Sequence, residues 1–324
     1  MGPSEKMAQD SNNPDEEMRM ISKIFFSVIA SLALIENTAV LLLFVRNTTW
    51  LKRPHNQCIL SLAIADVMTA ISLLVLPKFV TEQNAFTVPS DHLAREVYCR
   101  VIWSHFIPFS LGITSVYTCL VLAIERWFAV VRPYDYKQTA GVRIMKIMIP
   151  LCWLAGFVFE GFVIPRVSGV EGTNTTAPHC KWSDPTDKIT SWSLAITMFV
   201  AHTIVPVCVI PIAYLHLFFT LRRQRTPAVN FSRSNVSVSD KIYKRATIMM
   251  AVASLTLILC WLPNNIYFLL AMLGFLAPQA ASISVILSGL AFLNSCVNPI
   301  IYGYMNKDFR KGYRQLLFCC SNRN

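Results

Sequence analysis

The sequence predicts an all-α membrane protein, a bundle of seven transmembrane helices followed by a short amphipathic cytoplasmic helix. Of its 324 residues, 54% are apolar, and the mean hydropathy is +0.47, which is unusual for a soluble fold. The apolar residues form uninterrupted runs of about twenty or more, the length that a helix needs to cross roughly 30 Å of hydrocarbon. These runs are continuous rather than alternating, which argues against a membrane β-barrel and favours helices, whose backbone hydrogen bonds are internal.

Seven apolar runs are long enough to span a membrane, at residues 21–45, 57–80, 99–131, 144–163, 190–221, 242–273 and 282–304. They divide the chain into an extracellular tail at 1–20, a seven-helix domain at 21–305 and a cytoplasmic segment at 306–324. The tail is polar and acidic and lacks the start and cleavage site of a signal peptide, so the first span is expected to anchor itself. In the last segment, Phe309 and Tyr313 are i,i+4 neighbours among basic residues, which predicts an amphipathic helix against the membrane lipids.

The net charge of +11 is distributed by loop and is not gathered in one region. With the N-terminus outside, the cytoplasmic segments hold 20 of the 29 Lys and Arg and only four acids, while the outer side holds nine basic and twelve acidic residues. Because basic residues are enriched on the cytoplasmic side, this bias predicts a multi-pass plasma-membrane protein with its C-terminus in the cytoplasm. It also argues against a nucleic-acid-binding protein, which would gather its basic residues on one surface.

The ten cysteines fall into three groups. Cys99, at the outer end of the third span, and Cys180, in the long loop after the fourth, face the oxidising side, so we expect a disulfide between them. Cys319 and Cys320 follow the amphipathic segment and are candidates for palmitoylation, with two unmodified thiols as the alternative. The other six lie within apolar spans and are expected to pack as small hydrophobes: Cys58, Cys119, Cys152, Cys208, Cys260 and Cys296.

Four Asn-x-Ser/Thr sequons occur, at Asn47, Asn174, Asn230 and Asn235. The expected orientation places three of them in the cytoplasm, out of reach of glycosylation. Only Asn174 is therefore a candidate glycosylation site.

Asp66 lies in the middle of the second span, where an ionisable group is costly and needs partners. The seventh span offers Asn294, Ser295 and Asn298 at helical spacing, and the first span offers Asn37. Such a cluster of oxygens around one carboxylate suits a small cation or a proton. The alternative is a polar network that only holds the helices together.

Short motifs occur in every span. They are Asn37 in the first, Leu62-Ala63-Ile64-Ala65-Asp66 in the second, Glu125-Arg126-Trp127 in the third, Trp153 in the fourth, Pro206 in the fifth, Cys260-Trp261-Leu262-Pro263 in the sixth and Asn298-Pro299-Ile300-Ile301-Tyr302 in the seventh. One motif of this size occurs by chance, but seven in matching spans and order do not. The set resembles rhodopsin-like (class A) G-protein-coupled receptors over residues 21 to about 318, and its general pattern is most similar to the peptide-receptor branch.

The resemblance implies a receptor, and no enzyme, that binds an extracellular ligand and activates a heterotrimeric G protein, with arrestin as a further partner. Glu125 would restrain Arg126 at rest, and Trp261 would lie beneath the ligand. On activation, Tyr214 and Tyr302 would swing toward Arg126 as the sixth span moves outward.

The resemblance also implies that the helices can bend and that a sodium ion binds among them. Pro206, Pro263 and Pro299 each remove a helical hydrogen bond, so their helices can kink. No cofactor is implied beyond sodium, whose pocket maps onto five residues: Asp66, Ser115, Asn294, Ser295 and Asn298.

Several positions depart from the family pattern. Glu36 stands before Asn37 where a Gly is usual, and its partner is unknown. Pro108 lies within the third span, and the stretch from Cys99 to Arg126 is two residues longer than usual, which a proline-associated bulge would absorb. Leu257 stands where an activation-relay Phe is usual.

Two ligand classes are disfavoured because the residues that would bind them are missing. Amine receptors carry an Asp in the third span, and the matching position here is Pro108, so an amine ligand is not expected. Opsins carry a Lys in the seventh span, and the matching position here is Phe292, so retinal is not expected either. The outer loop is long and polar and carries acids, and the outer face is slightly acidic, which favours a neuropeptide-like peptide, a basic one among the options, with a lipid or another small molecule as the alternative. Residues expected to line the pocket are Phe109, Glu160, Asn264 and Asn265, although Glu160 is expected rather to extend toward the membrane interface.

A seven-helix ion or proton transporter is the competing class, because Asp66 and Glu36 could form part of a cation path. The span pattern shows no inverted repeat, and the basic cytoplasmic face suits an acidic partner. Enzymes are disfavoured because the six His have no metal spacing and no glycine-rich phosphate loop occurs.

Overall fold

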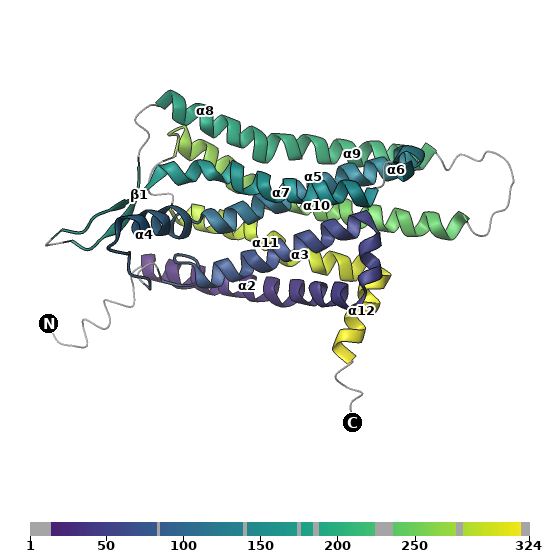
Figure 1. Ribbon diagram of the computed structural model, residues 1–324, viewed down its shortest axis with the longest axis horizontal. Coiled ribbons are helices and arrows are strands. Elements are labelled where there is room, and N and C mark those ends of the chain that lie inside the picture. Colours follow the sequence, from purple (N-terminus) through teal and green to yellow (C-terminus); the bar gives the residue numbers. More distant parts are fainter. Residues whose placement is uncertain are drawn as a thin grey trace.

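The computed structural model is a bundle of long helices that run side by side along one axis (Figure 1). The structure describes residues 14–82, 85–138, 141–173, 176–183, 188–223, 236–276 and 281–318. Within these ranges seven helical segments are long and apolar enough to cross a membrane, which confirms the predicted fold class.

The long helices are α2 (Pro14–Arg46), α3 (Pro54–Val75), α5 (Phe106–Val131), α7 (Gly141–Glu160), α8 (Lys188–Phe199), α9 (Val205–Arg223), α10 (Val236–Met272) and α11 (Ala281–Met305). The π-helical turn η4 (Val200–Ile204) joins α8 to α9 as one span. Shorter elements connect them: η1 (Thr48–Lys52), α4 (His92–Val97), η2 (Tyr98–Trp103), α6 (Pro133–Gln138), η3 (Gly161–Arg166), the strands β1 (Val167–Val170) and β2 (His179–Trp182), and α12 (Lys307–Phe318).

Helix α5 is the central helix of the bundle. In its most apolar stretch 78% of the residues are buried, against 22% in the fourth and fifth spans, whose outward faces remain for lipid. One apolar core surrounds the inner half of α5, and a second, smaller core joins α2, α3 and α11 near the outer end. Cys208 is exposed on α9, so the expectation that all six span cysteines are packed is wrong at this position.

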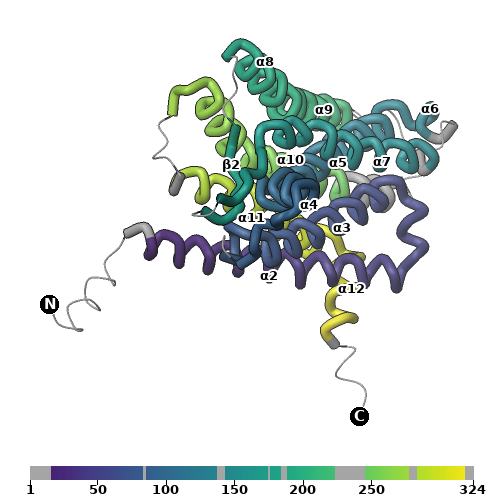
Figure 2. The backbone as a smooth tube through the Cα atoms, turned by 60° about the vertical axis from the view of Figure 1, so that its left-hand side comes forward, coloured from purple at the N-terminus to yellow at the C-terminus, as the bar shows by residue number. Residues whose placement is uncertain are grey.

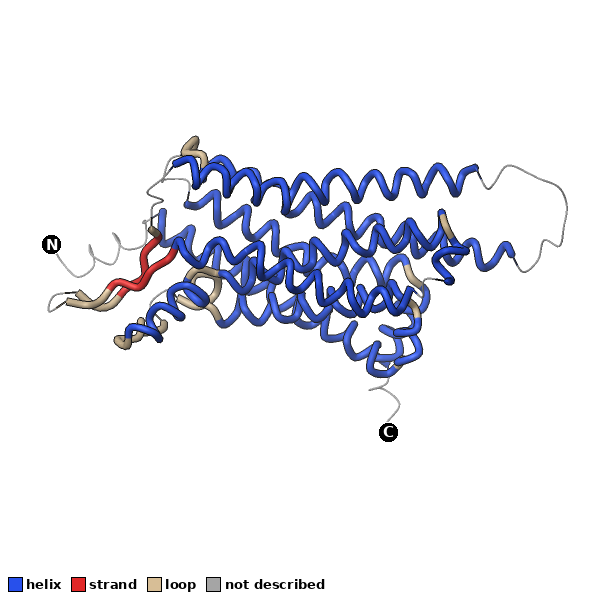
Figure 3. The backbone as a smooth tube through the Cα atoms, turned by 45° about the horizontal axis from the view of Figure 1, so that its top comes forward, coloured by secondary structure: helices blue, strands red, loops and turns tan. Residues whose placement is uncertain are grey.

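The two ends of the bundle carry different short elements. At one end lie α4 and the antiparallel hairpin of β1 and β2, which projects beyond the helices (Figures 1 and 3). At the other end lie α6 and α12 (Figures 1 and 2). We call these the outer and inner ends, following the orientation that the charge distribution predicts.

The predicted spans differ from the helices mostly at the outer end. The first helix begins at Pro14 instead of residue 21. The second ends at Val75 instead of residue 80, because Pro77 follows it and Lys78 has the left-handed φ of 84°.

The third span begins at Phe106 instead of residue 99. The π-helical turn η2 covers residues 98–103, and His105, at φ 64°, breaks the helix before α5 starts. The extra length is thus absorbed before Pro108, not at it, and Pro108 lies in the first turn of α5, where no backbone donor is needed.

Candidate functional site

The inner end of α5 holds a closed polar lock around Arg126. Glu125 and Arg126 are both 3% exposed, and the guanidinium makes two hydrogen bonds to the carboxylate, one of them from Nε to Oε2 at 2.5 Å. Tyr136 of α6 donates its hydroxyl hydrogen bond to Oε1 of the same carboxylate. The predicted pair is therefore present, and a tyrosine that the motif does not contain completes it.

Trp127, the third residue of the motif, points away from this lock. Its indole Nε1 donates to Nδ1 of His216 on α9 at 2.9 Å, and the two rings lie 5.9 Å apart. Tyr136 and His216 were both missed by sequence reasoning, because each partner comes from another element and has no fixed spacing from the motif.

The polar cluster around Asp66 lies between α3 and α11. Asp66 is 1% exposed, and it accepts hydrogen bonds from Ser295 Oγ at 2.8 Å and from Asn298 Nδ2 at 3.2 Å. Asn37 of α2 donates to the backbone oxygen of Ser295 at 2.8 Å. Asp66, Ser295 and Asn298 are therefore joined by direct hydrogen bonds, and Asn37 connects α2 to this cluster through the Ser295 backbone.

Ser115 and Asn294 complete the predicted cation set. Both are buried, and neither forms a hydrogen bond to Asp66 among the described residues. Ser115 Oγ and the side-chain oxygens of Asn294 and Asn298 have no hydrogen-bond partner in the described part of the chain. Of these residues, Asn298 is bonded to Asp66, and buried oxygens without a donor are the type of ligand that a hard cation such as sodium takes.

An aromatic floor, formed by Trp261, Phe109 and Phe292, lies further toward the outer end. The ring of Trp261 lies 6.3 Å from Phe109 and 6.1 Å from Phe292, and Phe109 lies 5.3 Å from Phe292. Gly112 of α5 lies directly against the indole, since a Cβ at this position would be 2.1 Å from Trp261 Cζ2. A glycine is therefore required here, which the sequence alone did not indicate.

Above this floor lie the two asparagines that were expected to line the pocket. Asn264 accepts a hydrogen bond from Ser288 Oγ of α11 at 3.3 Å, so it is engaged between two helices. Asn265 lines a small cavity of about 10 Å³ with His202, Thr203, Pro206 and Trp261, which is space for one water-sized group. The His202 ring nitrogen Nε2 has no partner among the described residues.

Glu160 does not extend to the membrane interface, so that expectation is wrong. Its residue is only 8% exposed, at the last position of α7. One turn earlier, a Cβ at Gly156 would be 2.1 Å from Thr114 Oγ1, so this face of α7 packs tightly against α5. Residues four apart share a face of a helix, which places Glu160 on the packed side and not on the lipid side.

The remaining predicted residues occupy the core. Trp153 Nε1 donates to Ser61 Oγ at 3.0 Å, which joins α7 to α3. Tyr214 and Leu257 are buried, and the ring of Tyr302 lies 5.5 Å from that of Phe309 on α12, at a tilted angle of 44°. Pro263 and Pro299 lie inside α10 and α11. Glu36 is partly buried, and its Oε2 has no partner among the described residues.

The predicted disulfide between Cys99 and Cys180 is confirmed, with an S–S distance of 1.99 Å. It joins η2 to strand β2, and Trp103 and Trp182 lie beside it with their rings 5.8 Å apart. The hairpin is thus held against the outer end of the bundle. Asn174, Cys319 and Cys320 lie outside the described residues.

The chain is similar to known receptors over most of its length. The family described as 7 transmembrane receptor (rhodopsin family) matches residues 36–302. Neuropeptides B/W receptor type 2 of Homo sapiens is 28% identical over 306 residues, which cover 91% of this chain and 85% of the relative. Galanin receptor type 2 of Mus musculus is 25% identical (97% and 80% covered), and somatostatin receptor type 3 of Rattus norvegicus is 26% identical (94% and 70% covered). With its motifs in all seven spans, the chain belongs to the rhodopsin family of seven-transmembrane receptors, the class A G-protein-coupled receptors.

Proposed function

We propose that this receptor lies in the plasma membrane with its N-terminus outside, binds an extracellular peptide and activates a heterotrimeric G protein. The observation that carries the proposal is the lock of Glu125, Arg126 and Tyr136, a buried polar switch at the inner end. The names of the relatives support a peptide ligand, since neuropeptide, galanin and somatostatin receptors are each named for one.

The switch works as a two-state element. A ligand that contacts the aromatic floor more favourably in one state shifts the population toward that state. Helix α10 carries both Trp261 and Pro263, where the missing hydrogen bond lets the helix bend, so a change at the floor moves its inner half. Opening there exposes Arg126, and the basic loops beside it suit an acidic surface of a G protein.

Sodium in the Asp66 cluster opposes this change in our proposal. An ion bound to Asp66 and to the unpartnered oxygens of Ser115 and Asn294 holds α3, α5 and α11 together in the resting state. Arrestin binding, palmitoylation of Cys319 and Cys320 and a glycan on Asn174 belong to the same proposal.

The test measures nucleotide exchange on purified G proteins in membranes that carry the chain, with a peptide library as the input. We expect at least one peptide fraction to accelerate exchange in the native chain. Arg126→Met should abolish the response, whereas Arg19→Met should keep it, because Arg19 is exposed near the outer end of α2, away from the basic inner loops. Peptide-driven ion flux without exchange on any G protein would refute the receptor function.

A further inference from the structure

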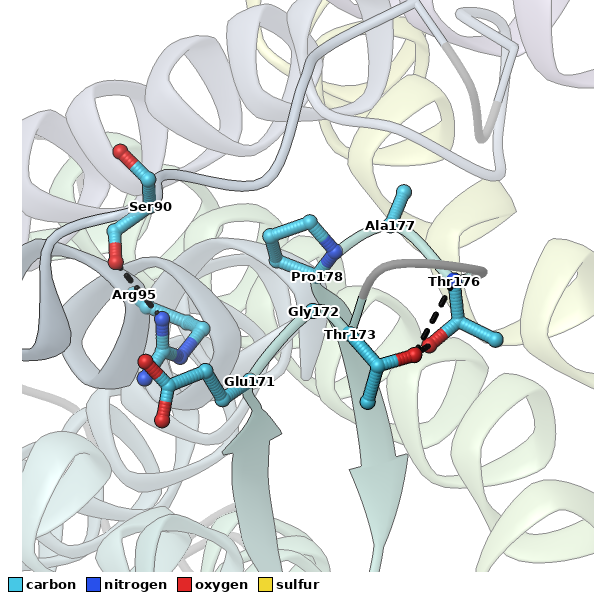
Figure 4. Close-up of a pocket in the computed structure, with 8 residues that line it drawn as sticks. All are labelled: Ser90, Arg95, Glu171, Gly172, Thr173, Thr176, Ala177 and Pro178. Carbon is cyan, nitrogen blue, oxygen red and sulfur yellow. Dashed lines mark hydrogen bonds between the residues drawn. The ribbon is translucent and has the colours of Figure 1, made fainter.

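A second cavity lies at the outer end, away from the aromatic floor. It has a volume of about 530 Å³ and lies between α4 and the tip of the β1–β2 hairpin (Figure 4). Its lining is polar: Ser90, Arg95, Glu171, Gly172, Thr173, Thr176, Ala177 and Pro178. A volume in this range is typical of sites for small organic ligands and is much larger than one inorganic ion needs.

Arg95 is the buried charged group of this cavity, whereas Glu171 is exposed. It is only 3% exposed, and its Nη1 donates to the backbone oxygen of Ser90 at 2.7 Å. Among the described residues, its Nε has no hydrogen-bond partner, and no carboxylate forms an ion pair with it. A buried guanidinium without a counter-ion is costly, so the site is incomplete as it stands.

Two of the neighbouring acids are engaged elsewhere. Glu96 accepts from Arg100 Nε at 2.7 Å and from the Gly169 backbone N at 3.1 Å, and the Arg100 bond lowers the pKa of Glu96 below its ordinary value. Asp91 caps α4 by accepting from the Ala94 backbone N at 2.9 Å. Glu171 lies on the same side of the cavity as Arg95 (Figure 4), but no hydrogen bond or ion pair joins these two residues.

The hairpin holds the Arg95 side chain in place. A Cβ at Gly169 would be 2.5 Å from Arg95 Cγ and 3.1 Å from Cδ, so only glycine lets the arginine stem pass. Gly169 pairs in register with Cys180, whose disulfide to Cys99 fixes the strand. The guanidinium is therefore positioned by a covalently anchored wall and is not a mobile surface group.

We propose that this cavity binds a carboxylate of the peptide ligand, an acidic side chain or a free C-terminus, with Arg95 as its partner. A guanidinium matches a carboxylate through parallel hydrogen bonds. The hydroxyls of Thr173 and Thr176 lie across the cavity from Arg95 and bond to each other at 2.8 Å (Figure 4). The hairpin projects beyond the helices, which favours a ligand from solution over a lipid headgroup (Figure 3). That the carboxylate belongs to a peptide rests on the proposed function, whereas the anion site itself does not.

The test uses trifluoroacetate as a carboxylate probe, and its binding is followed by fluorine NMR. The full chain carries Asn174→Gln, so that no glycan contributes, and is held in nanodiscs of phosphatidylcholine. Arg95→Gln should weaken binding by about tenfold, since a charge-assisted bond is lost. Lys181→Gln is the matched control, because Lys181 is exposed on the same hairpin, and it should leave binding unchanged.

Glu171→Gln should change probe binding in the opposite direction. Removing this carboxylate from the cavity should strengthen probe binding by about threefold, because a like charge no longer opposes the anion. This variant decides the question if Arg95→Gln does not fold, as judged by thermal unfolding. Equal binding by Arg95→Gln and the native chain, or no gain from Glu171→Gln, would overturn the site.

Competition separates the possible sources of the anion. N-acetylaspartate amide presents a side-chain carboxylate, and N-acetylglycine presents a terminal carboxylate. The compound that displaces the probe at the lower concentration identifies the type of carboxylate that the cavity prefers. Displacement only by vesicles of an anionic lipid would overturn the peptide assignment. Arg95-dependent probe binding without any G-protein response would refute the proposed function and leave the site standing, and the reverse would refute the site alone.

Discussion

Tyr136 allows the proposed switch at Arg126 to be tested by removing a single oxygen atom, the hydroxyl that bonds to Glu125. Tyr136→Phe removes only the hydroxyl that donates to Glu125 and leaves the bonds between Glu125 and Arg126 in place. Burial, and then the Glu125 charge, raise the pKa of Tyr136, so it stays a donor at neutral pH. A hydrogen bond to an ionised, buried carboxylate contributes about 1.5 kcal/mol or more.

If this bond exists only in the resting state, its loss shifts the equilibrium between the two states by its full free energy. About 1.4 kcal/mol corresponds to a factor of ten, so basal nucleotide exchange should rise up to about tenfold while the resting state dominates. Glu125→Gln should have a larger effect, because it leaves Arg126 buried and unpaired at a cost of roughly 3–5 kcal/mol.

The assay is basal exchange on a purified G protein, normalised to the number of receptors in the membrane. Tyr134→Phe is the matched control, since Tyr134 lies on the same short helix and is 73% exposed. It should behave as the native chain does. Basal exchange in Tyr136→Phe equal to that of Tyr134→Phe, while Glu125→Gln is raised, would show that the tyrosine does not restrain the switch.

Three further outcomes test other parts of the bundle. Asp66→Asn should abolish any effect of sodium on agonist affinity, measured by radioligand displacement in sodium and in choline chloride, and an unchanged salt response would leave only a structural network. Gly112→Ala should lower the free energy of unfolding by about 1–3 kcal/mol, because its Cβ overlaps Trp261, whereas Gly161→Ala, with nothing within 4 Å, should change little in thermal unfolding. Cys99→Ser should lose ligand binding at the cell surface, since the hairpin is released; normal surface expression and binding would count against this role.

The seven spans were predictable because their length and continuity follow from the hydrocarbon thickness alone. Their outer ends were not, because π-helical turns and left-handed residues leave no mark on apolarity. The apolar residues Val101, Ile102 and Trp103 extend the predicted span back to residue 99, yet η2 and His105 interrupt the helix before Phe106. The break depends on tertiary support, since His105 Nε2 lies 3.2 Å from the backbone oxygen of Pro77 on another element.

The site residues also fall into those that the sequence could predict and those that it could not. Glu125, Arg126 and Trp261 were found because fixed motifs carry them. Tyr136 and Gly112 were not, because their roles arise from the approach of a separate helix. The error at Glu160 has a related cause: its position at a helix end suggested the interface, but the face of α7 that carries Gly156 decides where its side chain lies.

Helix α5 carries the physical link between the two ends. Gly112, against Trp261, and Arg126, in the lock, lie 14 residues apart, about 21 Å along one helix and within roughly 40° of the same face. Trp261 belongs to α10 and packs directly against Gly112 of α5. A ligand that displaces the indole therefore acts on both helices at this contact. Because packed helices hold few alternative arrangements, such a displacement favours a discrete second state over a gradual deformation. A substitution at Gly112 and one at Tyr136 should therefore bias the same equilibrium, and their effects on basal exchange should be coupled despite the distance.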